Sequence, residues 1–164
     1  MPKNWKDWSI LITCLLIAHA AGALGSVFTI TAIPLWYSAL VLPPFSPPNW
    51  VFGPVWTLLY TLLGIALYIV WRTRGGDIER GRRRTRAVTL FAVQLILNAL
   101  WSILFFGLQS PLYALVDIAL LVVFISATMV YFFKVNKIAG YLLIPYLLWV
   151  IFAGVLNYSI FVLN

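Results

Sequence analysis

Apolar residues in this chain gather into five long runs, and charged residues occur almost only between them. The runs predict helices, because none shows the ten-residue alternation that is typical of a membrane β-barrel. A helix of roughly 20 residues rises about 1.5 Å per residue and so crosses a hydrocarbon core about 30 Å thick. The predicted helices lie at about residues 9–28, 50–71, 87–108, 112–133 and 138–163.

The composition indicates the solvent in which these helices fold. Hydrophobic residues make up 63% of the chain, charged residues make up 9%, and the mean hydropathy is +1.00. Soluble domains have about 25% charged residues, so this chain has too little polar surface for a water-exposed globule. The fold class is therefore all-α: an integral membrane bundle of five transmembrane helices, predicted as a single domain over residues 1–164.

Basic residues distinguish the two ends of the predicted bundle. The eleven Lys and Arg fall within residues 3–6, 72–86 and 134–137. With five spans these segments share one side, and the positive-inside rule predicts the N-terminus inside and the C-terminus outside. The arginine-rich stretch TRGGDIERGRRRTR could suggest nucleic-acid binding. Contact with anionic lipid headgroups explains it better, so membrane lipid and no nucleic acid is the expected partner.

An uncharged, proline-rich segment joins the first two predicted helices. Residues 42–56 read LPPFSPPNWVFGPVW, with five prolines. Loops are normally polar, and apolar irregular backbone is tolerated at membrane depth only where it packs on protein or shields a cavity. Proline has a fixed φ and no N–H, which suits a rigid cover. We predict that residues of about 30–49 form a lid.

Polar side chains inside the predicted spans gather at the depth beneath this lid. Counting about 1.5 Å per residue from the outer end places Asp117 and Asn157 about 9 Å deep, and His19 and Asn98 about 15 Å deep. Trp56, Trp101 and Ala153 fall in the same band, with Gln94 and Trp149 lower. Polar groups in a membrane are costly and often functional, so this clustering predicts a binding site in the outer half of the bundle.

Helical spacing puts several of these residues on common faces. Tyr146, Trp149, Ala153 and Asn157 share one face of the last span. Ala18, Gly22 and Ser26 form a small-residue face on the first, which permits a close approach or leaves a hollow. Each stripe alone is explained by interhelical packing, with the amides as cross-helix hydrogen bonds. Together they favour a tryptophan-walled cavity.

Isolated ionisable residues can have a structural role as well as a functional one. Asp117 is either a structural hydrogen-bonding group or a group that acts on a ligand or a proton. His19 is expected to be a packed, hydrogen-bonded imidazole, since no second axial haem ligand is evident. One His, one Cys and one intramembrane Asp do not make a metal cluster or a hydrolytic triad, so no metal site is expected.

Three segments match the pattern of one family. They are WYSALVLPPFSPPNWVFGPVWTLLY, QLILNALWSILFF and PYLLWVIFAGVLNY, in this order. With them, residues 22–164 resemble the TspO/MBR family of translocator and tryptophan-rich sensory proteins. The resemblance implies five-helix bundles, often homodimeric, that have a pocket formed by all five helices beneath the first loop. It implies porphyrin, haem-type and isoquinoline carboxamide ligands, with no obligatory cofactor.

Site residues carry over from the family motifs by position. The resemblance assigns porphyrin contact to Trp56 and Trp149, a ligand-facing amide to Asn98, and the lid tryptophan to Trp50. Trp101 takes the place of a family aromatic residue, and Ala153 the place of a small one. The complete set of candidate ligand-binding residues is Gly22, Trp50, Trp56, Tyr60, Asn98, Trp101, Asp117, Tyr146, Trp149, Ala153 and Asn157.

The sequence leaves two functional classes open. One is a receptor or carrier that binds tetrapyrroles such as protoporphyrin IX, haem or a bilin for sensing, buffering or transport. The other is a light- and oxygen-dependent degradation of bound porphyrin that uses Trp56 and Trp149. Tyr158 is followed by SIFVLN, without the basic residue of the animal cholesterol motif. A bacterial-type member in the cytoplasmic membrane is therefore expected.

Overall fold

The computed structural model describes residues 4–73 and 78–164, and Lys3 and Arg74 of the charge pattern lie outside them. Its helices are α1 (Trp5–Ala32), α2 (Asn49–Arg72), α3 (Ile78–Ser102), α4 (Pro111–Val135), α5 (Lys137–Leu142) and α6 (Ile144–Leu163). A 3-10 turn, η1 (Tyr37–Ala39), lies between α1 and α2, and a π-helix, η2 (Ile103–Gly107), continues α3.

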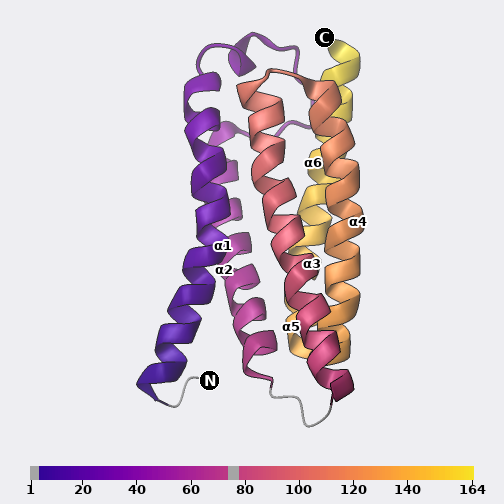
Figure 1. Ribbon diagram of the computed structural model, residues 1–164. Helices are drawn as coiled ribbons and strands as arrows, with labels where there is room; N and C mark the ends of the chain where they lie inside the picture. Colours follow the sequence, from indigo (N-terminus) through magenta and orange to yellow (C-terminus); the bar gives the residue numbers. More distant parts are fainter. Residues whose placement is uncertain (1–3, 74–77) are drawn as a thin grey trace.

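Five helical segments in the described ranges are long and apolar enough to cross a membrane. They are α1, α2, α3 with η2, α4, and α5 with α6, which confirms the predicted all-α bundle. The segments run alternately up and down, so the two termini lie at opposite ends (Figure 1). We call the end with the N-terminus the basic end, because it carries Arg80–Arg86, Lys134 and Lys137, and the other the loop end.

Helix ends differ from the hydropathy prediction for identifiable reasons. α1 starts at Trp5, not at residue 9, because the Asn4 side chain accepts a hydrogen bond from the Asp7 N–H at 3.0 Å and caps the helix. α3 starts at Ile78, nine residues before the predicted 87, because its arginine-rich first turns are helical although too polar for a hydropathy window. The predicted lid shortens to residues 33–48, since α1 continues to Ala32 and α2 begins at Asn49.

The fifth span breaks near its basic end into α5 and α6. Pro145 stands at the start of α6 and cannot donate the backbone hydrogen bond that would continue α5. Leu143 lies between the two helices, and its N–H bonds to the Gly140 carbonyl at 3.2 Å. The fifth span therefore consists of two successive helices instead of the single predicted one.

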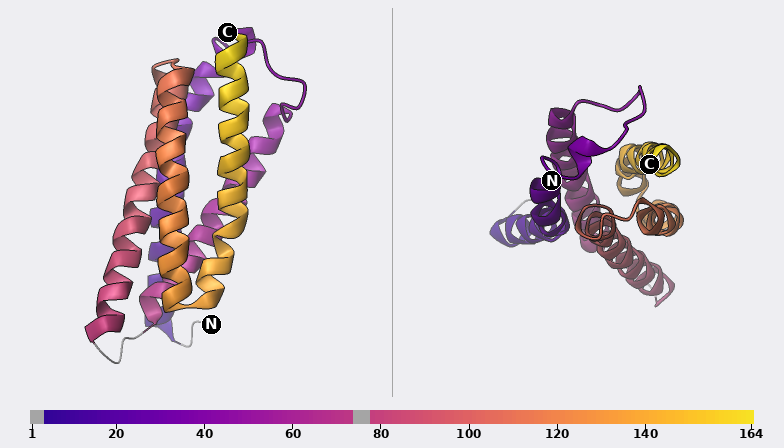
Figure 2. Two further views of the ribbon diagram at one scale, coloured as in Figure 1. Left: turned by 90° about the vertical axis from the view of Figure 1, so that its right-hand side faces the viewer. Right: turned by 90° about the horizontal axis from the view of Figure 1, so that it is seen from above.

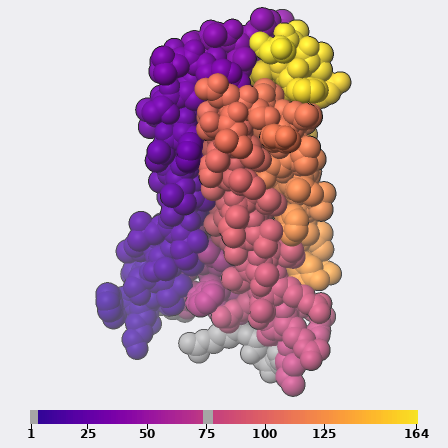
Figure 3. Space-filling view, turned by 45° about the horizontal axis from the view of Figure 1, so that its top comes forward, coloured from indigo at the N-terminus to yellow at the C-terminus, as the bar shows by residue number. Residues whose placement is uncertain are grey.

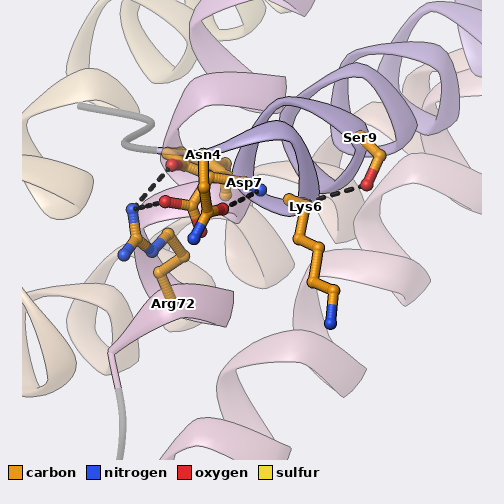
Figure 4. A network of polar contacts seen from close by, with 6 residues as sticks. Asn4, Lys6, Asp7, Ser9 and Arg72 are labelled. Carbon is orange, nitrogen blue, oxygen red and sulfur yellow. Dashed lines mark hydrogen bonds and ion pairs between the residues drawn. The ribbon is translucent and has the colours of Figure 1, made fainter.

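An ion pair ties the basic ends of α1 and α2 together (Figure 4). Arg72 Nη1 lies 2.9 Å from Asp7 Oδ2 and also donates to the Tyr68 hydroxyl at 3.1 Å. Further along, α1 and α2 touch closely: a Cβ on Gly64 would lie 2.8 Å from Leu15 Cα. The close approach therefore depends on the missing side chain at Gly64.

The interior of the bundle is filled toward the basic end. The large side chains Leu63, Phe91, Phe132 and Leu143 are fully or almost fully buried there. Phe91 and Phe132 stack with centroids 5.7 Å apart and an interplanar angle of 13°. Exposed apolar side chains such as Leu24, Val123 and Leu148 cover the outer surfaces of the helices, as expected for contact with lipid.

Candidate functional site: a neutral aromatic cavity at the loop end

The loop half of the bundle encloses a cavity of about 570 Å³. α1, α2, α3 with η2, and α6 line it, and Tyr37 of the α1–α2 loop closes its top. α4 contributes no lining residue, because it packs behind α3 and α6. The expectation that all five helices form the pocket is therefore wrong for α4.

Eight of the eleven candidate residues lie around this one cavity. They are Gly22, Trp56, Tyr60, Asn98, Trp101, Trp149, Ala153 and Asn157. Trp50 lies at the start of α2 with 75% of its surface exposed, outside the lining. Tyr146 is completely buried behind the wall, and Asp117 on α4 is 4% exposed and lies outside the lining. The structure thus brings most of the candidates together and separates these three.

A hydrogen-bonded chain fixes the inner wall. The Tyr60 hydroxyl donates to Asn98 Oδ1, and Asn98 Nδ2 donates to the Tyr146 hydroxyl at 3.1 Å. The three side chains come from α2, α3 and α6, so they join these helices directly beneath the cavity. The Asn98 amide is oriented by both partners, as buried polar groups in a membrane require.

A second amide organises the wall nearer the loop. Trp101 Nε1 donates to Asn157 Oδ1 at 3.1 Å, and Asn157 Nδ2 donates to the Pro111 carbonyl at 2.8 Å. The indole N–H of Trp101 is therefore used within the protein, and its ring presents an apolar surface. Trp149 differs, because its Nε1 is buried without a hydrogen-bond partner in the described structure. It is an available donor in the wall of the cavity.

Aromatic rings give the cavity flat sides. Trp56 stacks on Tyr60 with centroids 5.3 Å apart, and Trp101 stacks on Phe105 at 5.2 Å. Trp149 meets Phe52 edge to face at 6.0 Å. Each tryptophan is thus held by a neighbouring ring, and such pairs contribute about 0.5–1.5 kcal/mol beyond their buried area.

The π-helix turns an additional aromatic residue into the site. Its widened turn is closed by the Leu108 N–H on the Ile103 carbonyl at 2.8 Å. Phe105 and Phe106, which are adjacent in sequence, both line the cavity together with Trp101 and Ser102. π-helical turns occur often at functional sites because they change which side chains face inward. Phe105 lies four residues after Trp101, at regular helical spacing, whereas Phe106 does not share that face.

The α1–α2 loop roofs the cavity from the loop end. Tyr37 is buried against Phe105 and Phe106, and burial raises the pKa of its hydroxyl. The loop passes the end of α6 before it descends to α2 (Figure 2), and Figure 3 shows the two in contact on the surface. The Val41 N–H donates to Asn164 Oδ1 at 2.9 Å, and Asn164 Nδ2 donates to the Val41 carbonyl at 3.1 Å. These bonds attach the predicted lid to α6.

Among the described residues, no Asp, Glu, Lys or Arg lines the cavity. His19 lies in the lining and pairs with the Thr61 hydroxyl at 3.2 Å, in agreement with the packed imidazole expected from the sequence. The described residues contain no cluster of three potential His, Cys, Asp or Glu metal ligands. Phe52 and Tyr37 line the cavity although they were not among the candidate residues predicted from the sequence. Phe52 precedes Trp56 and Tyr60 by helical steps of four, which is a usable signal, whereas a loop residue has none.

A bundle of five membrane-spanning segments, four of which line an aromatic cavity of ligand size, defines a multi-pass membrane protein with an internal cavity. Residues 14–163 match the TspO/MBR family, and the chain belongs to that family. It is 48% identical over 155 residues to the tryptophan-rich protein TspO of Archaeoglobus fulgidus, covering 94% of this chain and 96% of the relative. It is 36% identical over 151 residues to the translocator protein of Bos taurus, covering 92% and 88%.

Proposed function

We propose that the protein is a membrane receptor or carrier that binds a tetrapyrrole of the porphyrin, haem or bilin class in the loop-end cavity. Its role would be sensing, buffering or transport in a bacterial cytoplasmic membrane, in keeping with the similarity to proteins named for translocation and sensing. The observation that carries the proposal is that Trp56, Trp101 and Trp149, from three helices, line one neutral cavity.

The aromatic walls suit a flat, conjugated ligand. Such a ligand is already dissolved in the bilayer, so burial alone gains little free energy and ring stacking must provide selectivity. Trp56 and Trp101 each stack on a neighbouring ring that restricts their orientation. Less side-chain conformational entropy is therefore lost when a ligand binds against them. A volume of 570 Å³ lies within the range of about 300–1,000 Å³ of small-molecule sites.

Polar contacts would orient the ligand. The candidate residues Tyr60, Asn98 and Asn157 each already donate a hydrogen bond within the protein. Among the described lining residues, Trp149 has a buried N–H donor without a partner. Since the lining is neutral, anionic ring substituents would lie toward the loop and water, where charge is less costly.

A titration in the dark tests binding. Purified full-length protein is titrated with protoporphyrin IX and, separately, with haemin, while tryptophan fluorescence is followed. Saturable quenching should weaken in Trp56→Phe and Trp149→Phe and stay unchanged in Trp8→Phe, an exposed tryptophan near the basic end. An isoquinoline carboxamide should compete for the same cavity. Quenching that does not saturate, or that all three variants weaken equally, would refute the proposed site.

Illumination of the same samples tests the alternative, porphyrin degradation. New absorbance bands that need light and oxygen and disappear in both cavity variants would assign chemistry to Trp56 and Trp149. Unchanged spectra would leave the protein as a binding protein.

A further inference from the structure

A second, smaller cavity lies at the basic end, at the opposite end of the bundle from the aromatic one. Its volume is about 280 Å³, and it is lined by Thr73, Arg80, Arg83, Arg84, Lys134 and Val135. Three elements meet there: the residue that caps α2, the first turns of α3 and the last turn of α4. The start of α3 and the end of α4 are side by side at the foot of Figure 1.

Helical spacing places the arginines of the pocket on one face of α3, and cation–π contacts hold two of the pocket's cations in position. Arg80, Arg83 and Arg84 stand at positions i, i+3 and i+4, which share one face of α3. The Arg84 guanidinium lies 5.0 Å above the Trp71 ring, and Lys134 Nζ lies 5.0 Å above the Tyr131 ring. These cation–π contacts hold the two charges beside aromatic residues at the ends of membrane spans.

Four of the six lining residues of this pocket are basic: Arg80, Arg83, Arg84 and Lys134. No acidic side chain contributes to its lining among the described residues. Glu79 pairs with Arg83 through Nε at 3.0 Å, but this glutamate is 58% exposed and lies outside the lining. An exposed pair of this kind is weak and screened by salt, so it leaves Arg83 able to bind another anion.

We propose that this pocket binds the phosphate of an anionic phospholipid headgroup. Planar guanidinium groups bind phosphate through two parallel hydrogen bonds, and Lys134 adds a compact point charge. The volume is just below that of a typical site for a whole drug-sized molecule, so it suits a headgroup whose acyl chains stay outside. Basic pockets between transmembrane helices bind lipid headgroups in this way.

The position of the pocket favours lipid over a free phosphate. Its residues directly adjoin the apolar segments of α2, α3 and α4, and Trp71 is 46% exposed at the same level. A phospholipid anchored by its chains in the surrounding bilayer therefore reaches the pocket at a high local concentration, whereas a soluble anion must compete from bulk water.

Two charge-matched triple variants test this site. Arg83→Gln, Arg84→Gln and Lys134→Gln together empty the pocket of three cations. The control combines Arg82→Gln, Arg86→Gln and Lys137→Gln, which removes two arginines and one lysine from the same end but none from the lining. Both are reconstituted as full chains in nanodiscs of phosphatidylcholine with phosphatidylglycerol, and retained phosphatidylglycerol is counted by native mass spectrometry after detergent extraction.

The wild-type protein and the control should retain phosphatidylglycerol, and the pocket variant should bind it about tenfold more weakly or worse. Equal loss in both variants would mean general charge attraction and would overturn the proposal. Displacement of the lipid by millimolar inorganic phosphate would identify a soluble anion as the occupant and overturn the lipid assignment. Circular dichroism melts of both variants exclude unfolding as the cause.

Discussion

The two halves of this bundle differ in how far side chains fill the interior between the helices. Near the basic end, large apolar side chains such as Phe91, Phe132 and Leu143 fill the interior. Near the loop end, small residues on α1 and α6 and tethered aromatic rings surround a space of about 570 Å³. The same five helices therefore carry a closed half and an open half.

The difference shows what stabilises each half. Helices in lipid gain little from apolar burial alone, so their association depends on close packing and on interhelical hydrogen bonds. The closed half uses packing, as the stacked pair Phe91–Phe132 illustrates. The open half lacks filled volume, and its helices are joined by the amides of Asn98 and Asn157. In this half, polar side chains supply cross-helix contacts where the cavity leaves volume unfilled.

Gln94 and Asp117, which lie outside the cavity lining, carry unpartnered polar atoms. Gln94 is completely buried, and neither its Nε2 nor its Oε1 has a hydrogen-bond partner in the described structure. Asp117 Oδ2 is likewise buried and unpartnered. Because neither side chain lines the cavity, an effect of Asp117 on a ligand would have to be indirect.

The largest loss of stability should follow from removing a buried ring in the closed half. Phe132→Ala removes a fully buried ring and its stacking with Phe91, and should lower the free energy of unfolding by about 3–5 kcal/mol. Reversible unfolding in detergent measures this loss. Phe161→Ala, at an exposed position near the end of α6, is the control and should change little. Comparable losses in both would contradict the distinction between the halves.

A smaller loss should follow where α1 and α2 touch. In Gly64→Ala the new Cβ would lie 2.8 Å from Leu15 Cα, so backbone must move, at a cost of about 1–3 kcal/mol. Gly154→Ala is a matched control, since its Cβ would meet the Ile118 side chain at an ordinary 3.6 Å. Thermal unfolding of the two variants should separate them. Equal melting temperatures would show that this contact does not limit helix approach.

The sequence predicted the number, type and order of the helices, because membrane thickness imposes a long apolar run on each span. Eight of the eleven candidate residues line the cavity, because depth in the membrane, helical spacing and the family motifs all point to the same region. It could not place Tyr146 behind the wall, since residues on one face of a helix can lie at different distances from a cavity. The π-helix could not be predicted either, because the hydrogen-bond shift at Ile103–Leu108 has no marker in ILFFG.

Filling the open half should affect binding and not stability. Ala153→Leu projects into empty space, so the free energy of unfolding should change by about 1 kcal/mol or less. The same side chain occupies volume that a bound ligand needs, and protoporphyrin affinity should fall about tenfold. Fluorescence titration beside an unfolding curve measures both quantities. A stability loss as large as that of Phe132→Ala, with binding intact, would mean that this region is packed like the closed half.

The smallest change in stability should come from releasing the roof of the open half. Asn164→Ala removes two hydrogen bonds to Val41 and one to the Ile160 carbonyl, at an exposed position where their net contribution is about 1 kcal/mol or less. The loop should nevertheless open more often, so amide exchange in residues 36–45 and the dissociation rate of protoporphyrin should both rise, while exchange in the closed half stays unchanged. Ser38→Ala is the control, because in the described structure the Ser38 hydroxyl bonds to the Pro34 and Leu35 carbonyls, both within the loop. Equal dissociation rates in the wild-type protein and both variants would mean that the ligand leaves by a path that the Asn164 contacts do not control.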